Sequence, residues 1–196
     1  ALNCVANGKL LKKEIFDNIW VQPAAGDAGG SLGAALVTHY QMLNKQRITS
    51  KDDSMYGSFL GPQYTQGEVE TSLSKLNANF NILSEQDLIE QTANLLSEGK
   101  VVGWHQGRME FGPRALGARS ILGDARSPKM QKILNLKVKF RESFRPFAPS
   151  ILSEFVSEWF NLETESPYMT IVAKINESHR KDLDNKDKNL FGLDKL

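Results

Sequence analysis

Three arginines lie close together in a glycine-rich segment, residues 107–122, which reads GRMEFGPRALGARSIL. They are Arg108, Arg114 and Arg119. Glycine and proline interrupt the run, so it does not form a smooth amphipathic helix, and they permit a folded loop in which the guanidinium groups converge. A charge-assisted hydrogen bond contributes about 1.5–3 kcal/mol, and three or four convergent ones would bind a phosphate firmly. The segment therefore predicts an anion-binding loop.

The charge of the chain is unevenly distributed. The formal net charge is +1, but residues 100–145 hold eleven basic and three acidic residues, which gives +8 there and −7 in the remainder. This excess indicates an anionic ligand, either a small phosphate compound or a nucleic acid, and six of the eight arginines lie in the stretch. The alternative is a solvated surface whose arginines pair with acids elsewhere. The glycines between the arginines and the phenylalanines beside them argue against that alternative.

A second glycine-rich segment, GDAGGSLGAA at residues 26–35, precedes a helical pattern. Such a turn exposes backbone N–H groups to phosphate, although its spacing matches neither a P-loop nor a dinucleotide fingerprint. Asp27 at its tip could ligate a metal ion, and a purely structural turn is an equal alternative. His105 ends a predicted strand beside the arginine segment and is a candidate polar contact. Ser120 has no His or Asp at a recognisable spacing, so it gives no signal of a serine nucleophile.

The elements that must position these residues follow from hydrophobic periodicity and capping signals. Strands are predicted at 19–22, 101–105, 120–122 and 167–175, and helices at 31–43, 65–76, 84–98, 128–138 and 152–160. Ser84 with Asp87 three residues later predicts a capped helix start, and Gly99 predicts the end of that helix. The opening residues ALNCVANGKL show no capping signal. The predicted fold class is mixed α/β.

Length and composition limit the class of protein further. The 196 residues, 40% of them apolar and 24% charged, suit one large globular domain or two small ones. No apolar run approaches the roughly 20 residues of a membrane span. Cys4 is the only cysteine, which excludes an intrachain disulfide and disfavours a cysteine-based metal site. We therefore expect a cytoplasmic protein without membrane partners.

Two long motifs resemble a known family. The segments GWHQGRMEFGPRALGARSILGDARS (103–127) and NLKVKFRESFRPFAPSIL (135–152) resemble the C-terminal domain of the O-carbamoyltransferases of nodulation and antibiotic tailoring. ALNCVANGKL and IWVQPAAGDAGGSLGAAL look like the last part of the same family's N-terminal, actin-like (Kae1-like) domain. The resemblance implies an actin-like ATPase-fold fragment at 1–45, a linker at 46–65, and a twisted sheet with helices similar to the YrdC/Sua5 fold at 66–196.

The resemblance implies a two-step reaction with ATP and a divalent metal, iron or magnesium, as cofactors. The YrdC-like domain would condense carbamoyl phosphate with ATP to carbamoyl adenylate, and the actin-like domain would pass the carbamoyl group to a hydroxyl-bearing small molecule. The resemblance implies as catalytic residues Arg108, Arg114 and Arg119. It implies phosphate binding by Lys137, Lys139, Arg141, Arg145 and His105. It implies nucleotide binding by Gly29, Gly30 and Asn3, and metal binding by Asp27.

The resemblance also leads us to expect a fragment of a larger protein, which is inactive in carbamoyl transfer by itself. Metal-binding histidines of the family lie upstream of the motif that begins this chain, and the YrdC-like domain normally continues past residue 196. Two alternatives stay open from the sequence: an RNA-binding module and a threonylcarbamoyl-adenylate type of tRNA-modification module. Glycine-punctuated arginines favour a compact pocket over a nucleic-acid groove.

Overall fold

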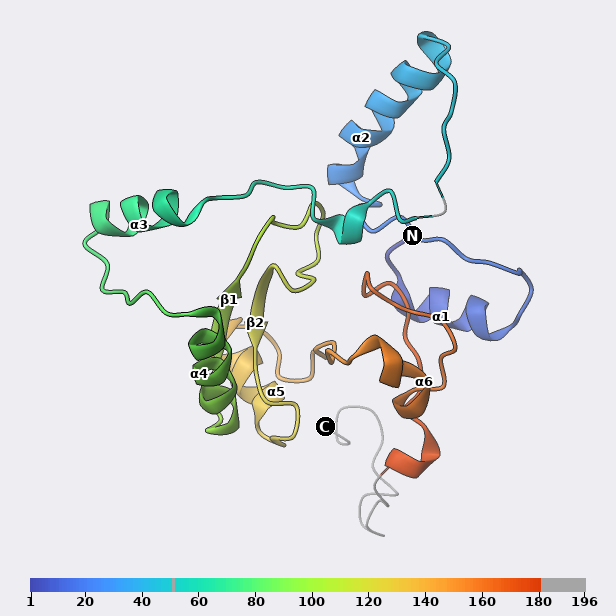
Figure 1. The fold of residues 1–196 in the computed structure, drawn as a ribbon. Coiled ribbons are helices and arrows are strands. Elements are labelled where there is room, and N and C mark those ends of the chain that lie inside the picture. Colours follow the sequence, from blue (N-terminus) through green and yellow to red (C-terminus); the bar gives the residue numbers. More distant parts are fainter. Residues whose placement is uncertain (51, 181–196) are drawn as a thin grey trace. The chain divides into compact units, whose positions relative to one another are not determined.

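The computed structural model describes residues 1–50 and 52–180 (Figure 1). Its α-helices are α1 (Cys4–Lys12), α2 (Asp27–Val37), α3 (Gln66–Lys75), α4 (Glu85–Ser97), α5 (Met130–Ile133) and α6 (Val156–Trp159). Shorter helical turns are η1 (Thr38–Met42), η2 (Tyr56–Ser58), η3 (Leu134–Val138), η4 (Ser153–Phe155) and η5 (Glu177–His179). Strands β1 (Val102–His105) and β2 (Arg119–Leu122) form a two-stranded sheet. The predicted mixed α/β class is confirmed.

Contacts divide the described residues into two compact units. The first unit contains Ala1–Leu88, Gly103–Ile121 and Ser166–Val172, and the second contains Ile89–Val102, Leu122–Glu165 and 173–180. The domain boundaries expected from the sequence stay a prediction. No helix in these residues has the length and apolar character needed to cross a membrane.

Local capping explains where α3 and α4 begin. Thr65 and Glu68 form a reciprocal capping box at the start of α3, with each side chain bonded to the other residue's backbone N–H. At the start of α4 the Asp87 backbone N–H donates to Ser84 Oγ at 3.2 Å. Gly99 follows α4 with a φ of +76°, the left-handed conformation in which helices commonly end. The predicted boundaries of α4 are therefore confirmed at both ends.

The N-terminal segment differs from its prediction. Asn3 caps α1, because its Oδ1 accepts a hydrogen bond from the Ala6 backbone N–H at 3.0 Å, so the prediction of no capping signal was wrong. The predicted glycine turn is also wrong, since α2 already begins at Asp27 and includes Gly29 and Gly30. Consecutive small residues in this segment permit helix as readily as turn once Gly26 supplies an extended N-cap.

Two predicted strands do not form. Residues 19–22 contain no strand, and residues 167–175 contribute only an isolated antiparallel bridge, between Ile175 and Phe160. Both segments have the β-branched composition typical of strands, but β propensity depends on a neighbouring strand with which to pair. The described residues supply that partner only for β1 and β2.

The sheet is a hairpin whose connection contains the arginines. Beyond the end of β1 the Gln106 backbone N–H donates to the Ala118 carbonyl at 3.0 Å, so residues 107–117 form the hairpin loop. Ala118 is buried in the first unit together with Met55 and Tyr168. In the second unit the buried residues include Met130, Leu134 and Asn135. We call residues 107–117 the arginine loop.

Candidate functional site

Backbone hydrogen bonds attach the arginine loop to the segment that follows η2. Gly61 N–H donates to the Met109 carbonyl and Met109 N–H donates to the Pro62 carbonyl, both at 2.9 Å, and Phe111 N–H donates to the Ser58 carbonyl at 2.6 Å. A Cβ atom at Gly61 would lie 2.8 Å from the Met109 carbonyl oxygen, so only glycine fits this approach. Part of the linker expected at residues 46–65 therefore supports the arginine loop.

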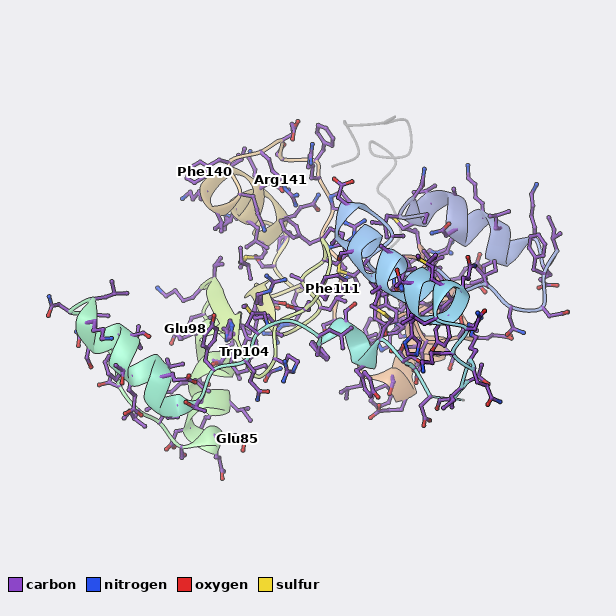
Figure 2. The ribbon with its side chains drawn as sticks, turned by 90° about the horizontal axis from the view of Figure 1, so that it is seen from above. Glu85, Glu98, Trp104, Phe111, Phe140 and Arg141 are labelled. Carbon is purple, nitrogen blue, oxygen red and sulfur yellow. The ribbon has the colours of Figure 1, made fainter. Side chains whose placement is uncertain are left out.

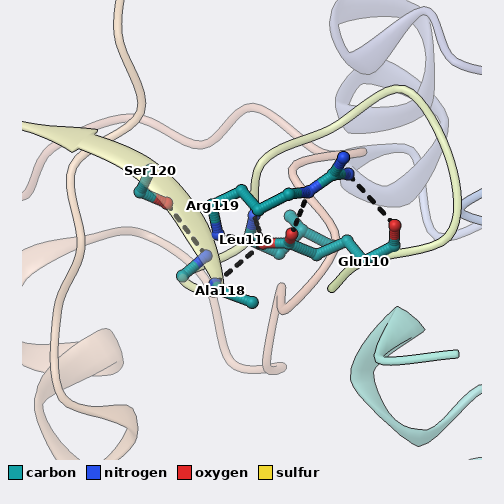
Figure 3. A network of polar contacts seen from close by, with 6 residues as sticks. Glu110, Leu116, Ala118, Arg119 and Ser120 are labelled. Carbon is teal, nitrogen blue, oxygen red and sulfur yellow. Dashed lines mark hydrogen bonds and ion pairs between the residues drawn. The ribbon is translucent and has the colours of Figure 1, made fainter. Parts of the chain in front are cut away.

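The shape of the loop is set by one buried carboxylate. The Glu110 side chain is 0% exposed, and its Oε1 accepts hydrogen bonds from the backbone N–H groups of Leu116 (2.6 Å), Ala118 (2.8 Å) and Arg119 (3.2 Å) (Figure 3). The other oxygen, Oε2, pairs with Arg119 Nε at 3.0 Å, and Arg119 Nη2 donates to the Glu110 carbonyl at 3.0 Å. Glu110 therefore holds both sides of the loop together.

The same contacts keep Glu110 ionised. Burial by itself would raise the pKa of this carboxyl, but the hydrogen bonds from Leu116 N–H, from the Arg119 side chain and from Ala118 N–H outweigh it and lower the pKa to about 2. Gly112 and Gly117 allow the chain to turn around the carboxylate, with φ values of +126° and +112° that a side chain would oppose. The predicted glycine-dependent loop is confirmed in its backbone.

Ion pairs sort the arginines of residues 100–145 into two sets. Each of the three acids in this stretch pairs with one arginine, as Glu110–Arg119 (3.0 Å), Asp124–Arg126 (2.9 Å) and Glu142–Arg145 (2.9 Å). Among the described residues the other three have no carboxylate partner, and these are Arg108, Arg114 and Arg141. The ion pairs leave these three cations available for an external anion.

Arg114 stands out within the arginine loop. Its side chain is half-buried, and its Nε is fully buried without a hydrogen-bond partner in the part of the chain that the structure describes. Arg108 is exposed and donates from Nη1 to the Gly61 carbonyl at 2.8 Å. His105 is exposed at the end of β1. An unpartnered buried guanidinium nitrogen costs free energy in the folded state.

The remaining phosphate candidates belong to the second unit. Lys137 lies in η3 and Lys139 directly after it, and both are exposed. Arg141 is half-buried with its guanidinium carbon 4.9 Å from the centroid of the Phe147 ring. Figure 2 shows Arg141 next to Phe140 at the end of this helical segment. These predicted residues thus lie in η3 or within a few positions after it.

The nucleotide and metal candidates lie at the starts of α1 and α2. Asn3 is occupied in capping α1, and Gly29 packs so closely on the Ala24 carbonyl that a Cβ would collide with it, whereas Gly30 has open space. Asp27 is exposed in the first turn of α2. No three His, Cys, Asp or Glu side chains within residues 1–50 and 52–180 are grouped closely enough to hold a metal ion. Asp27 by itself would supply only one of the several oxygen ligands that a divalent metal takes.

Sequence reasoning missed two residues, Glu110 and Asn135. In the sequence Glu110 contributed only to the charge of residues 100–145. Asn135 contributed only as the first residue of the motif at 135–152. A lone acid inside a glycine-punctuated run of arginines is a usable signal, because such a loop has many backbone N–H groups to satisfy. Asn135 is fully buried and bonds to the turn that carries Arg141.

Comparison with known families identifies both ends of the chain. Residues 93–186 match the family described as carbamoyltransferase C-terminus, and residues 1–36 match carbamoyltransferase N-terminus. The chain belongs to the carbamoyltransferase family. The resemblance carried by the arginine motif is therefore confirmed, and the arginine loop lies inside the C-terminal match.

Relatives in the carbamoyltransferase family cover the same region. An uncharacterized protein of Synechocystis is 54% identical over 198 residues, covering all of this chain and 32% of the relative. Nodulation protein NolO of Bradyrhizobium diazoefficiens is 42% identical over 181 residues, covering 91% of the chain and 32% of the relative. Nodulation protein U of Sinorhizobium fredii is 36% identical over 168 residues, covering 86% of the chain and 27% of the relative. The chain thus spans about a third or less of these relatives' length.

Proposed function

We propose that the chain is part of an O-carbamoyltransferase that activates a carbamoyl group with ATP and transfers it to the hydroxyl of a small molecule. The observation that carries the proposal is the match of both ends of the chain, in order, to the two parts of the carbamoyltransferase family. The three arginines left without a carboxylate partner support it, because both substrates of the activation step are phosphates. A protein that handles two phosphate substrates needs fixed cations more than a covalent nucleophile.

The balanced reaction defines what the site must bind. Carbamoyl phosphate, ATP and one water yield carbamoyl adenylate, phosphate and pyrophosphate, because the adenylate keeps only the α-phosphorus of ATP. In the second step the acceptor hydroxyl attacks the carbamoyl carbon, its proton leaves, and AMP departs. Negative charge shifts between oxygens in each step, and preorganised guanidinium groups stabilise it.

Within this proposal Arg114 contacts a substrate phosphate directly, because it has no carboxylate partner among the described residues. Arg108 and Arg141 have no carboxylate partner there either, and Lys137, Lys139 and His105 are exposed. Arg119 and Arg145 pair with Glu110 and Glu142, so each would support the backbone of its own segment. Asn3, Gly29 and Gly30 remain the proposed nucleotide contacts and Asp27 the proposed metal ligand in the full-length protein, where a divalent metal would neutralise charge on ATP.

The test is made on the full-length protein. Adenylate formation is measured by the exchange of labelled pyrophosphate into ATP. This exchange should require carbamoyl phosphate. We expect Arg114→Ala to abolish the exchange with the fold intact. Arg126→Ala is the matched control, because Arg126 is exposed and paired with Asp124, and it should exchange at the wild-type rate.

Two outcomes would count against the proposal. Exchange that survives Arg114→Ala unaltered would remove Arg114 from the site. RNA binding that weakens steeply with salt, without stabilisation by carbamoyl phosphate or ATP, would favour the RNA-binding module instead. We also expect the 196 residues by themselves not to transfer the carbamoyl group, and transfer by this polypeptide would contradict that.

A further inference from the structure

Asn135 is a fully buried polar side chain whose amide is satisfied at both ends. It is 0% exposed, and its Nδ2 donates to the carbonyl oxygens of Ser143 (3.0 Å) and Arg145 (2.8 Å). Its Oδ1 accepts a hydrogen bond from Arg141 Nε at 2.7 Å. The backbone repeats the connection, since Arg141 N–H donates to the Asn135 carbonyl at 2.9 Å. Asn135 therefore joins the turn at 143–145 to the Arg141 side chain.

Arg141 is held on two sides and open on a third. Nε is fixed by Asn135, and the guanidinium lies over the Phe147 ring at 4.9 Å. Neither terminal nitrogen has a hydrogen bond or ion pair with any residue that the structure describes. A guanidinium fixed through Nε and one face presents its two terminal nitrogens in the geometry that grips two oxygens of one phosphate.

The neighbouring acid does not occupy this fork. Glu142 follows Arg141 in the sequence, but its carboxylate pairs with Arg145 Nε at 2.9 Å. Hydrogen bonding with its own backbone and attraction by Arg145, followed by a weaker attraction by Arg141, lower the pKa of Glu142, so it stays ionised at neutral pH. Lys137 and Lys139 are exposed on the same segment and add positive charge. Glu142 therefore leaves the two terminal nitrogens of Arg141 without a carboxylate partner.

We propose that Asn135 is a positioning residue, whose buried amide orients Arg141 so that both terminal guanidinium nitrogens bind one phosphate group of a substrate. This inference rests on the proposed function, which makes carbamoyl phosphate and ATP the ligands to be tested. In this role Asn135 acts through Arg141 and does not touch the substrate. Its effect on binding therefore disappears when Arg141 can no longer form the fork.

The experiment is a double-mutant cycle in the full-length protein. Arg141→Lys keeps the positive charge but removes both Nε and the fork, and Asn135→Ala removes the amide that orients it. Affinities for carbamoyl phosphate and for ATP are measured separately by calorimetric titration of the folded proteins. Arg126→Lys is the control for an arginine changed to lysine, since Arg126 pairs with Asp124 and is exposed.

Gln131→Ala is the control for the turn. Gln131 donates to the carbonyl oxygens of Phe144 (3.4 Å) and Arg145 (3.3 Å), so it supports the same turn as Asn135, but it does not bond to Arg141. We expect Arg141→Lys and Asn135→Ala each to weaken the affinity for one of the two ligands by about 10-fold or more, the value of one charge-assisted hydrogen bond. The double variant should be no weaker than the worse single variant within about 3-fold. Both controls should bind as the wild type does.

Three results would overturn the inference while leaving the proposed function intact. The first is wild-type affinity for both ligands in Arg141→Lys, which remains informative even if Asn135→Ala does not fold. The second is a lower melting temperature in Asn135→Ala with unchanged affinity, which is the result of a purely structural role. The third is full additivity in the cycle. If the wild-type protein binds neither ligand, the proposed function fails and the inference fails with it.

Discussion

Replacing Glu110 with glutamine should release the arginine loop. The substitution keeps the size of the side chain but removes its charge, and the amide nitrogen of glutamine would face Arg119 Nε, which is also a donor. The magnitude follows from the pKa, which contacts lower from 4.5 to about 2. At about 1.36 kcal/mol for each unit of pKa, the folded loop gains about 3 kcal/mol from the ionised carboxylate at neutral pH.

Hydrogen exchange measures this loss locally. The backbone N–H groups of Leu116, Ala118 and Arg119 donate to the carboxylate, so their protection reports its contribution. A loss of about 3 kcal/mol in the free energy of opening speeds their exchange about 100-fold at pH 7. Glu142→Gln is the matched control, because Glu142 is exposed and should leave these three amides unchanged.

The pH dependence gives a second reading of the same carboxylate. The folded protein binds the Glu110 proton more weakly than the unfolded chain does, because the pKa of this carboxyl is lower in the folded state. The stabilisation is therefore complete above about pH 4.5 and is lost as the pH falls towards 2. When the pH is lowered from about 4.5 towards 2, protection of the three amides, corrected for intrinsic exchange, should decrease in the wild type. It should not change in Glu110→Gln. Wild-type protection at pH 7 in the variant would refute the reasoning.

The other predictions concern residues of the first unit. Gly29→Ala should destabilise the first unit by about 2 kcal/mol or more, because the added Cβ would collide with the Ala24 carbonyl oxygen. Gly30→Ala meets open space and should stabilise α2 by about 0.5–1 kcal/mol. Equal midpoints of urea unfolding for the two variants would contradict this pair of predictions. Asn3→Ala should cost about 1 kcal/mol by removing the cap of α1, seen as faster exchange of its first-turn amides. Tyr168→Phe should raise the pKa of Asp53, because Asp53 Oδ2 accepts a hydrogen bond from the Tyr168 hydroxyl; a carboxyl titration followed by NMR would show no change if that bond is absent.

Local signals in the sequence were enough to predict much of the fold. The capped helix from Ser84 to Gly99 and the hairpin strands at 101–105 and 120–122 depend on residues near one another in the chain. The strand predicted at 167–175 failed because strand formation needs a partner at a distance, which composition does not reveal. The glycine turn predicted at residues 26–30 was wrong, because small residues permit both helix and turn and α2 already begins at Asp27.

The arginine loop was predictable from the sequence, but the pairing of its charges was not. Composition and spacing did not show which of the six arginines pair with acids. Pairing with Glu110, Asp124 and Glu142 makes three of them internal partners. Which acid reaches which arginine depends on the path of the backbone, as in the contact of Glu110 with Arg119 across the loop, so spacing could not supply it.

The carboxylate of Glu110 also has a consequence for the order of folding. Its partners lie only six to nine positions later in the chain, whereas the contacts of Met109 with Gly61 and Pro62 join segments separated by almost fifty residues. Closing a loop of about ten residues takes about 10–100 ns, and longer connections form more slowly. We expect the arginine loop to reach its curved shape early, as soon as β2 leaves the ribosome, and to dock later as a preformed unit.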